Sequence, residues 1–173
     1  MNDSFIRYAT ISDISLLVSI SAQTFYETYQ DTHLWSDLEY YVKNNLSELA
    51  IEADLNNKAI CYLLLFLHDE AIGYVKLDKA GTYELPKQSK NPIEISRIYL
   101  IKSAQGKGYG KILMEASVNY AIQHKHDGIY LAVWEGNTKA ILFYNKCGFL
   151  SYAETTFPMQ STTDRDLLLV KSL

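Results

Sequence analysis

The segment that most constrains the fold of this chain is residues 98–114, IYLIKSAQGKGYGKILM. An apolar run typical of a strand leads into Gly106, Gly108 and Gly110, and then into apolar residues at helical spacing. Such a strand, turn and helix start direct free main-chain N–H groups at one point, at the positive end of the helix dipole. The segment therefore predicts an α/β fold with an anion site suited to phosphate. Taken alone, the glycines are equally compatible with a tight turn and nothing more.

The spacing of these glycines excludes the commoner nucleotide motifs. The chain has no G-x-x-x-x-G-K-[ST] sequence, and its G-x-G-x-G run lacks the third glycine position of the dinucleotide fingerprint. The kinase sequences H-R-D and D-F-G are absent as well. The formal net charge of −4 argues against broad binding to nucleic acid and permits a cationic substrate.

Cysteine and histidine usage gives no sign of a metal site or a disulfide framework. Cys61 lies in an apolar run, and Cys147 lies near a helix end, where the dipole disfavours a thiolate nucleophile. The longest apolar run, 59–67, is far shorter than the roughly 20 residues that cross a bilayer. We therefore expect a cytoplasmic protein with no metal, no nucleic-acid partner and no membrane partner.

Hydrophobic periodicity predicts strands and helices along the whole chain. Strands are expected at 5–8, 59–68, 72–79, 93–101, 129–134, 149–154 and 166–171. Helices are expected from about 12 to 29, as one or two short helices within 37–55, from the glycines to about 124, and between an Asn137 cap and a Gly148 terminator. A turn at 68–71 and a surface loop at 81–92 complete the chain. The order β-α-α-β-β-β-α-β-α-β-β predicts a mixed sheet covered by helices, in a single domain that spans 1–173.

A second informative segment is residues 134–149, WEGNTKAILFYNKCGF. Asn137 and Tyr144 are seven residues apart, which is two helical turns, so both project from one face. Alone, Tyr144 is better explained as core packing. Together, however, the two segments resemble the GNAT superfamily of acyl-CoA N-acyltransferases. Gln105-x-x-Gly108-x-Gly110 is similar to its pyrophosphate loop, and 137–149 is similar to its A-x-x-F-Y-x-x-x-G-F helix.

Three further segments are similar to bacterial polyamine N-acetyltransferases of the PaiA type: SAQTFYETY at 21–29, GYVKL at 73–77 and VWEGN at 133–137. The resemblance implies a predominantly antiparallel seven-stranded sheet flanked by about four helices. It implies direct acetyl transfer from acetyl-CoA to a primary amine of a small molecule, with spermidine or spermine as leading candidates, and it allows a homodimer. Two alternatives stay open: an N-acetyltransferase acting on a protein, a peptide or an aminoglycoside, and a regulatory protein that binds acetyl-CoA with low turnover.

The resemblance also implies where acetyl-CoA binds. Its pyrophosphate is expected on the amides of 105–111, and its pantetheine beside the strand at 98–100. Lysines near these segments add positive charge. The candidate cofactor-binding residues are Ile98, Tyr99, Leu100, Gln105, Gly106, Lys107, Gly108, Tyr109, Gly110, Lys111, Asn137 and Lys146.

For catalysis, the resemblance implies Tyr144 as the general acid, because a phenol with a pKa near 10 stays protonated at neutral pH and can donate to a thiolate. Many relatives place a glutamate base on the central strand where this chain has Ser96. Glu94 shares the face of Ser96 by strand alternation and is our candidate base, acting through a water, with a solvated carboxylate as the equal alternative. Candidates for the acceptor slot are Phe25, Glu27, Trp134 and Glu135, with core packing the competing explanation for the aromatic ones.

Overall fold

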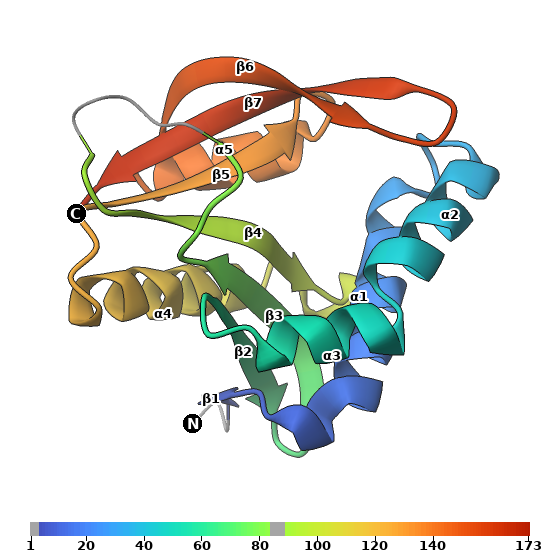
Figure 1. The fold of residues 1–173 in the computed structure, drawn as a ribbon, viewed down its shortest axis with the longest axis horizontal. Coiled ribbons are helices and arrows are strands. Elements are labelled where there is room, and N and C mark those ends of the chain that lie inside the picture. The colour runs from blue at the N-terminus through green and yellow to red at the C-terminus, as the bar shows by residue number, and fades with distance from the viewer. Residues whose placement is uncertain (1–3, 84–88) are drawn as a thin grey trace. The chain divides into compact units, whose positions relative to one another are not determined.

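The computed structural model describes residues 4–83 and 89–173, and it places helices and strands where periodicity predicts them (Figure 1). The strands are β1 (Ser4–Tyr8), β2 (Ile60–Leu67), β3 (Glu70–Asp78), β4 (Pro92–Leu100), β5 (Gly128–Trp134), β6 (Leu150–Pro158) and β7 (Thr163–Ser172). The α-helices are α1 (Ile14–Tyr29), α2 (Trp35–Asn45), α3 (Glu48–Asn56), α4 (Tyr109–Gln123) and α5 (Thr138–Lys146). Short 3₁₀ turns, η1 (Ile11–Asp13) and η2 (Lys102–Ala104), precede α1 and α4.

The strands form a seven-stranded sheet in the order β1-β2-β3-β4-β5-β7-β6. β1 with β2, β5 with β7 and β6 with β7 pair antiparallel, whereas β4 and β5 pair in parallel. The predicted class, a mixed and mostly antiparallel sheet with helices, is thereby confirmed.

Three details of the fold differ from the prediction. The polar segment 37–55 holds two helices, which agrees with the one or two expected there, but α-helices number five in the described residues instead of about four. The break falls at Ser47, whose hydroxyl accepts a hydrogen bond from the N–H of Ala50 and caps α3. The hairpin of β6 and β7 is longer than predicted, because polar residues of both strands continue the pairing to Pro158 and Thr163. Of the predicted loop at 81–92, residues 84–88 lie outside the described residues, and Pro92 already belongs to β4.

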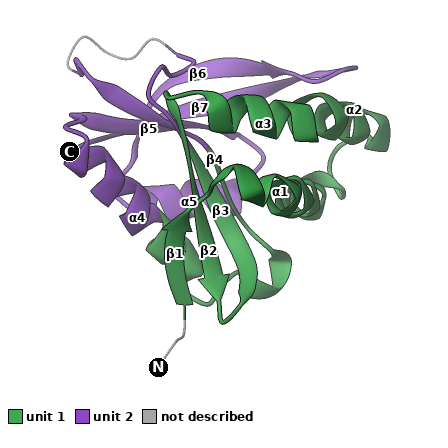
Figure 2. Ribbon diagram, turned by 60° about the horizontal axis from the view of Figure 1, so that its bottom comes forward, with its two compact units in different colours: residues 1–76, 97–113 green, residues 77–96, 114–173 purple. Residues whose placement is uncertain are grey.

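The chain divides into two compact units, coloured separately in Figure 2. Unit 1 comprises residues 1–76 and 97–113. Its core forms where α1 and α3 bury their apolar faces against β2 and β3, as helical and strand periodicity require. The buried residues of this core are Leu17, Ile20, Ile51, Tyr62, Leu64, Phe66 and Tyr74.

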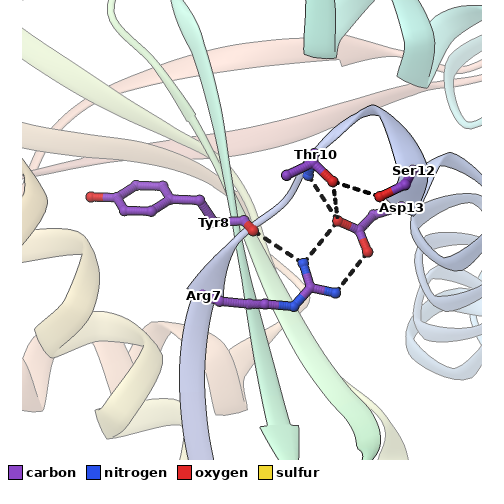
Figure 3. A network of polar contacts seen from close by, with 5 residues as sticks. All are labelled: Arg7, Tyr8, Thr10, Ser12 and Asp13. Carbon is purple, nitrogen blue, oxygen red and sulfur yellow. Dashed lines mark hydrogen bonds and ion pairs between the residues drawn. The ribbon is translucent and has the colours of Figure 1, made fainter.

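An ion pair in unit 1 fixes the exit of β1 into the first helix (Figure 3). The guanidinium of Arg7 donates to both carboxylate oxygens of Asp13, over 2.7 and 2.8 Å. The main-chain N–H of Thr10 donates to the same carboxylate at 2.8 Å. These contacts, the Arg7 hydrogen bond first, hold the pKa of Asp13 well below its usual range. Thr10 thereby forms a capping box with Asp13 at the start of η1.

Unit 2 comprises residues 77–96 and 114–173. Within it, β4 pairs with β5 from Pro92 to Glu94, and β5 pairs with β7 along its whole length. Directly paired residues present their side chains on the same face of a sheet. Glu94 and Tyr130 therefore share a face, and by strand alternation Trp134 and its partner Asp166 lie on that face too.

Candidate functional site

The predicted site residues are divided between the two units. Unit 1 carries the glycine loop, the end of β4 and the whole of α1, whose last turns include Phe25 and Glu27. Unit 2 carries Glu94, the end of β5 and the whole of α5 with Tyr144.

The glycine loop of unit 1 has the backbone that an anion site requires. Gly106 and Gly108 have φ of 74° and 90°, which L side chains rarely adopt, and α4 begins directly after them at Tyr109. The N–H groups of Lys111 and Ile112 already bond to the carbonyl of Gly108. Helix geometry leaves the N–H groups just before them without intrahelical partners. The loop therefore presents main-chain donors at the positive end of α4.

Space in front of this loop is open. A Cβ built on Gly106 or on Gly108 would meet no atom within 4 Å. Residues 105–108 are all exposed. The two glycines are therefore required by their backbone conformation and not by crowding within the protein.

Two hydrogen bonds hold the chain that leads into the loop, and a third orients the carboxylate of Glu27. The carboxylate of Glu27 in α1 accepts from the N–H of Lys102, the first residue of η2, at 2.6 Å. Its other oxygen accepts from the side-chain amide of Gln23 at 2.9 Å. The side-chain amide of Gln105 donates to the carbonyl of Leu100 at 3.2 Å. Glu27, which we expected in the acceptor slot, thus anchors the approach to the glycine loop in this structure.

The end of β4 joins the loop to an aromatic cluster in unit 1. The hydroxyls of Tyr99 and Tyr29 lie 3.3 Å apart, and the ring of Tyr99 lies 6.0 Å from that of Tyr74. Phe25 is buried and stacks on Tyr41 with ring centroids 4.5 Å apart. The competing explanation, core packing, therefore accounts for its position. Ile98 and Leu100 are half-buried beside Tyr99.

Arg97 lies in the same cluster, and sequence reasoning gave it no role. Its guanidinium donates to the hydroxyls of Tyr41 and Tyr62, both at 3.4 Å, and to the carbonyl of Asn45 at the end of α2. Tyr62 in turn donates to the carboxylate of Asp54 at 2.6 Å. Burial raises the pKa of Tyr62 well above its usual value, so that its hydroxyl stays a donor. These contacts tie α2 and α3 to the sheet.

In unit 2, Glu94 is buried and bound to its own neighbourhood. Its carboxylate accepts from the N–H of Thr82 at 2.6 Å and from the hydroxyl of Tyr130 at 3.3 Å. Burial raises the pKa of Glu94, while the hydrogen bonds from Thr82 and Tyr130 oppose that shift. The solvated alternative is wrong, because Glu94 is 5% exposed. Its hydrogen bonds fix the chain that follows β3.

Helix α5 is built as its sequence predicts. The side-chain oxygen of Asn137 accepts from the N–H of Ala140 at 3.2 Å and caps the helix, and Gly148 ends it with φ of 87°. Tyr144 is 8% exposed, and its ring lies 5.4 Å from Phe143 and 6.0 Å from Phe149. Lys146 is exposed.

The end of β5 pairs Trp134 with Asp166 of β7, a buried acidic residue that sequence reasoning missed. A Cβ on Gly136 would lie 2.4 Å from the ring of Trp134, so glycine is required there for the indole to fold over the turn. Glu135 is exposed and pairs with Arg165 at 3.3 Å. Asp166, the direct partner of Trp134 on β7, is 7% exposed, and its Oδ1 has no hydrogen-bond partner among the described residues. The signal that could have found it is a charged residue at an inward position of an apolar strand.

Two features are absent from residues 4–83 and 89–173. No three histidine, cysteine, aspartate or glutamate side chains gather as a metal ion would require. No helix in these ranges has the length and apolar character to cross a membrane.

Comparisons with known proteins agree with this geometry. The model of the acetyltransferase (GNAT) family matches residues 17–149. An uncharacterized N-acetyltransferase from the pepI 3' region of Lactobacillus delbrueckii subsp. lactis is 29% identical over 93% of this chain and 92% of its own. The spermine/spermidine N(1)-acetyltransferase of Bacillus subtilis is 26% identical over 60% of this chain and 68% of its own.

Solved structures show the same fold. The PaiA N-acetyltransferase of Thermoplasma acidophilum, in complex with coenzyme A, superposes with a TM-score of 0.80 at 20% identity, over 98% of this chain and 99% of its own. Because the family model spans most of α1 to the end of α5, including the glycine loop and Tyr144, the chain belongs to the acetyltransferase (GNAT) family and is an N-acetyltransferase.

Proposed function

We propose that residues 1–173 act as one acetyl-CoA-dependent N-acetyltransferase domain whose acceptor is the primary amine of a small cationic molecule, a polyamine such as spermidine being the first candidate. The observation that carries the proposal is the glycine loop, with main-chain donors at the start of α4 and open space before them. The similarity to a spermine/spermidine N(1)-acetyltransferase and to a PaiA enzyme that binds coenzyme A supports the choice of co-substrate and acceptor.

In this proposal the N–H groups of Gly106 to Gly110 bind the diphosphate of acetyl-CoA. The main chain of Ile98 to Leu100 hydrogen-bonds the pantetheine amides as a further strand would. Lys107, Lys111 and Lys146 add positive charge. The side chain of Glu27 serves this site indirectly, because it holds the turn before the loop.

The chemistry that the residues must perform is acyl transfer from sulfur to nitrogen. The neutral amine nitrogen attacks the thioester carbonyl, the C–S bond breaks, and the thiolate takes a proton, which we assign to the hydroxyl of Tyr144. The proton that the nitrogen loses as the amide forms restores this hydroxyl. The ammonium proton must leave before attack, at about 1.4 kcal/mol per pKa unit above the working pH. Glu94 is the proposed base, acting through a water, since burial raises its pKa toward neutrality.

The test is release of free thiol from acetyl-CoA in the presence of single amines. The panel contains spermidine, spermine, a lysine peptide and an aminoglycoside, and mass spectrometry identifies the product. We expect turnover to be fastest with the polyamines. Faster turnover with the peptide or the aminoglycoside would show that the acceptor is not a polyamine. Binding of acetyl-CoA without turnover on any amine would favour the alternative of a regulatory protein with low turnover.

A further inference from the structure

The carboxylate of Asp166 is a buried acidic group that has no role in the proposed reaction. The residue is 7% exposed, and its Oδ1 is fully buried with no hydrogen-bond partner in the part of the chain that the structure describes. Buried carboxylate oxygens in folded proteins are normally hydrogen-bonded or paired with a cation. A buried carboxylate oxygen without a partner is expected either to be protonated or to bind a ligand.

The described neighbours of Asp166 in unit 2 supply no such partner. Trp134 of β5 and Thr155 of β6 lie directly opposite it in the sheet, and neither side chain ionises. The charged neighbour on its own strand and face is Asp164, which repels it. Arg165 points to the other face by strand alternation, where it pairs with Glu154. The arginine adjacent in sequence therefore does not neutralise Asp166.

The arrangement suits a positively charged ligand. A carboxylate beside an indole offers an ammonium group two interactions: a charge-assisted hydrogen bond to the carboxylate and a cation–π interaction with the ring. The indole of Trp134 is itself held in place, because Gly136 leaves room for it to fold over the turn. Burial, and then repulsion by Asp164, raises the pKa of Asp166 to about 6, so the carboxyl is largely ionised at pH 7.5.

We propose that Asp166, with Trp134 beside it, binds an ammonium group of the acceptor amine. This inference rests on the proposed function and assigns its acceptor a positive charge. It adds a specificity-determining residue on β7 that the two sequence motifs do not contain. An acceptor without a cationic nitrogen near the reacting amine would gain nothing from this carboxylate.

The kinetic test compares Asp166→Asn with Asp164→Asn, which removes the same charge two residues away on the same strand. With the best acceptor of the amine panel, spermidine first, Asp166→Asn should raise the KM for the amine about 10- to 100-fold, as expected for loss of a hydrogen bond to a charged group. The KM for acetyl-CoA should not change. Asp164→Asn should behave as the wild type does. An unchanged KM for the amine in Asp166→Asn would overturn the assignment.

A second measurement on the wild-type protein does not depend on turnover or on the folding of a variant. The ¹³C resonance of the Asp166 carboxyl is titrated with pH, alone and with n-butylammonium chloride or n-butanol. The ammonium ion should lower the apparent pKa, because it stabilises the carboxylate, and the neutral alcohol should not. Equal pKa values in all three titrations would contradict the proposal. If no amine releases thiol from acetyl-CoA, the proposed function fails, while this titration still decides whether Asp166 binds ammonium.

Discussion

Replacing Gly108 by alanine tests whether the shape of the glycine loop binds the co-substrate. Gly108 has φ of 90°, and a Cβ there would meet nothing within 4 Å, so the substitution introduces backbone strain without a clash. An L-residue in the left-handed region costs roughly 1–2 kcal/mol. Because the loop is exposed, the free protein can relax out of this conformation and re-aim the N–H groups of the loop.

Binding of coenzyme A must then restore the strained loop, so the strain appears in the dissociation constant. A penalty of roughly 1–2 kcal/mol weakens binding by about 5- to 30-fold. Isothermal titration calorimetry with coenzyme A measures this change, and thermal unfolding is expected to show little loss of stability. An unchanged dissociation constant in Gly108→Ala would refute the reasoning.

Gly148→Ala is the matched control for this experiment. Gly148 has φ of 87°, and its added Cβ would make ordinary contacts of 3.7 and 3.8 Å with Lys171. It ends α5, so its strain should lower the stability of the protein by a similar amount. We expect the opposite pattern from that of Gly108→Ala: a lower unfolding temperature with an unchanged affinity for coenzyme A.

Three further substitutions test separate parts of the account. Tyr144→Phe should lower kcat roughly 10²-fold, with the KM for acetyl-CoA nearly unchanged, and steady-state turnover equal to wild type would remove the tyrosine as general acid. Glu94→Gln keeps an oxygen for the Thr82 and Tyr130 donors but should abolish the acidic limb of the pH profile of kcat/KM, and an unaltered profile would exclude Glu94 as the base. Asp13→Asn should reduce the free energy of unfolding by about 1–3 kcal/mol at pH 7 in urea titrations. Because the folded state lowers the pKa of Asp13, the stability that this carboxylate contributes is present above pH 4 and is lost as the pH falls, so variant and wild type should converge in acid.

Features set by neighbouring residues could be predicted from the sequence. The glycines at 106–110 predicted a turn before α4, and Gly106 and Gly108 have positive φ there. The cap at Asn137 and the terminator at Gly148 lie where their residue types predict, because each depends on a few residues of backbone. The order of strands and helices followed from periodicity in the same way.

Contacts between distant segments could not be predicted. The carboxylate of Glu27 accepts a hydrogen bond from the N–H of Lys102, which lies 75 positions further along the chain. No local sequence pattern in α1 predicts that partner. Glu94 was correctly placed on its strand, but its bonds to Thr82 and Tyr130 depend on how β4 pairs with β5. Asp166 lies beside Trp134 because of the antiparallel register of β5 and β7, which a one-residue slip would abolish.

Amide chemical shifts of the glycine loop provide the most direct test of how this enzyme holds acetyl-CoA. In ¹⁵N-labelled protein, coenzyme A should cause its largest shifts at the N–H groups of Gly106 to Gly110, and pantetheine, which lacks the diphosphate, should not reproduce them. Saturating coenzyme A that leaves these five amides unmoved while shifting others would show that the diphosphate binds elsewhere.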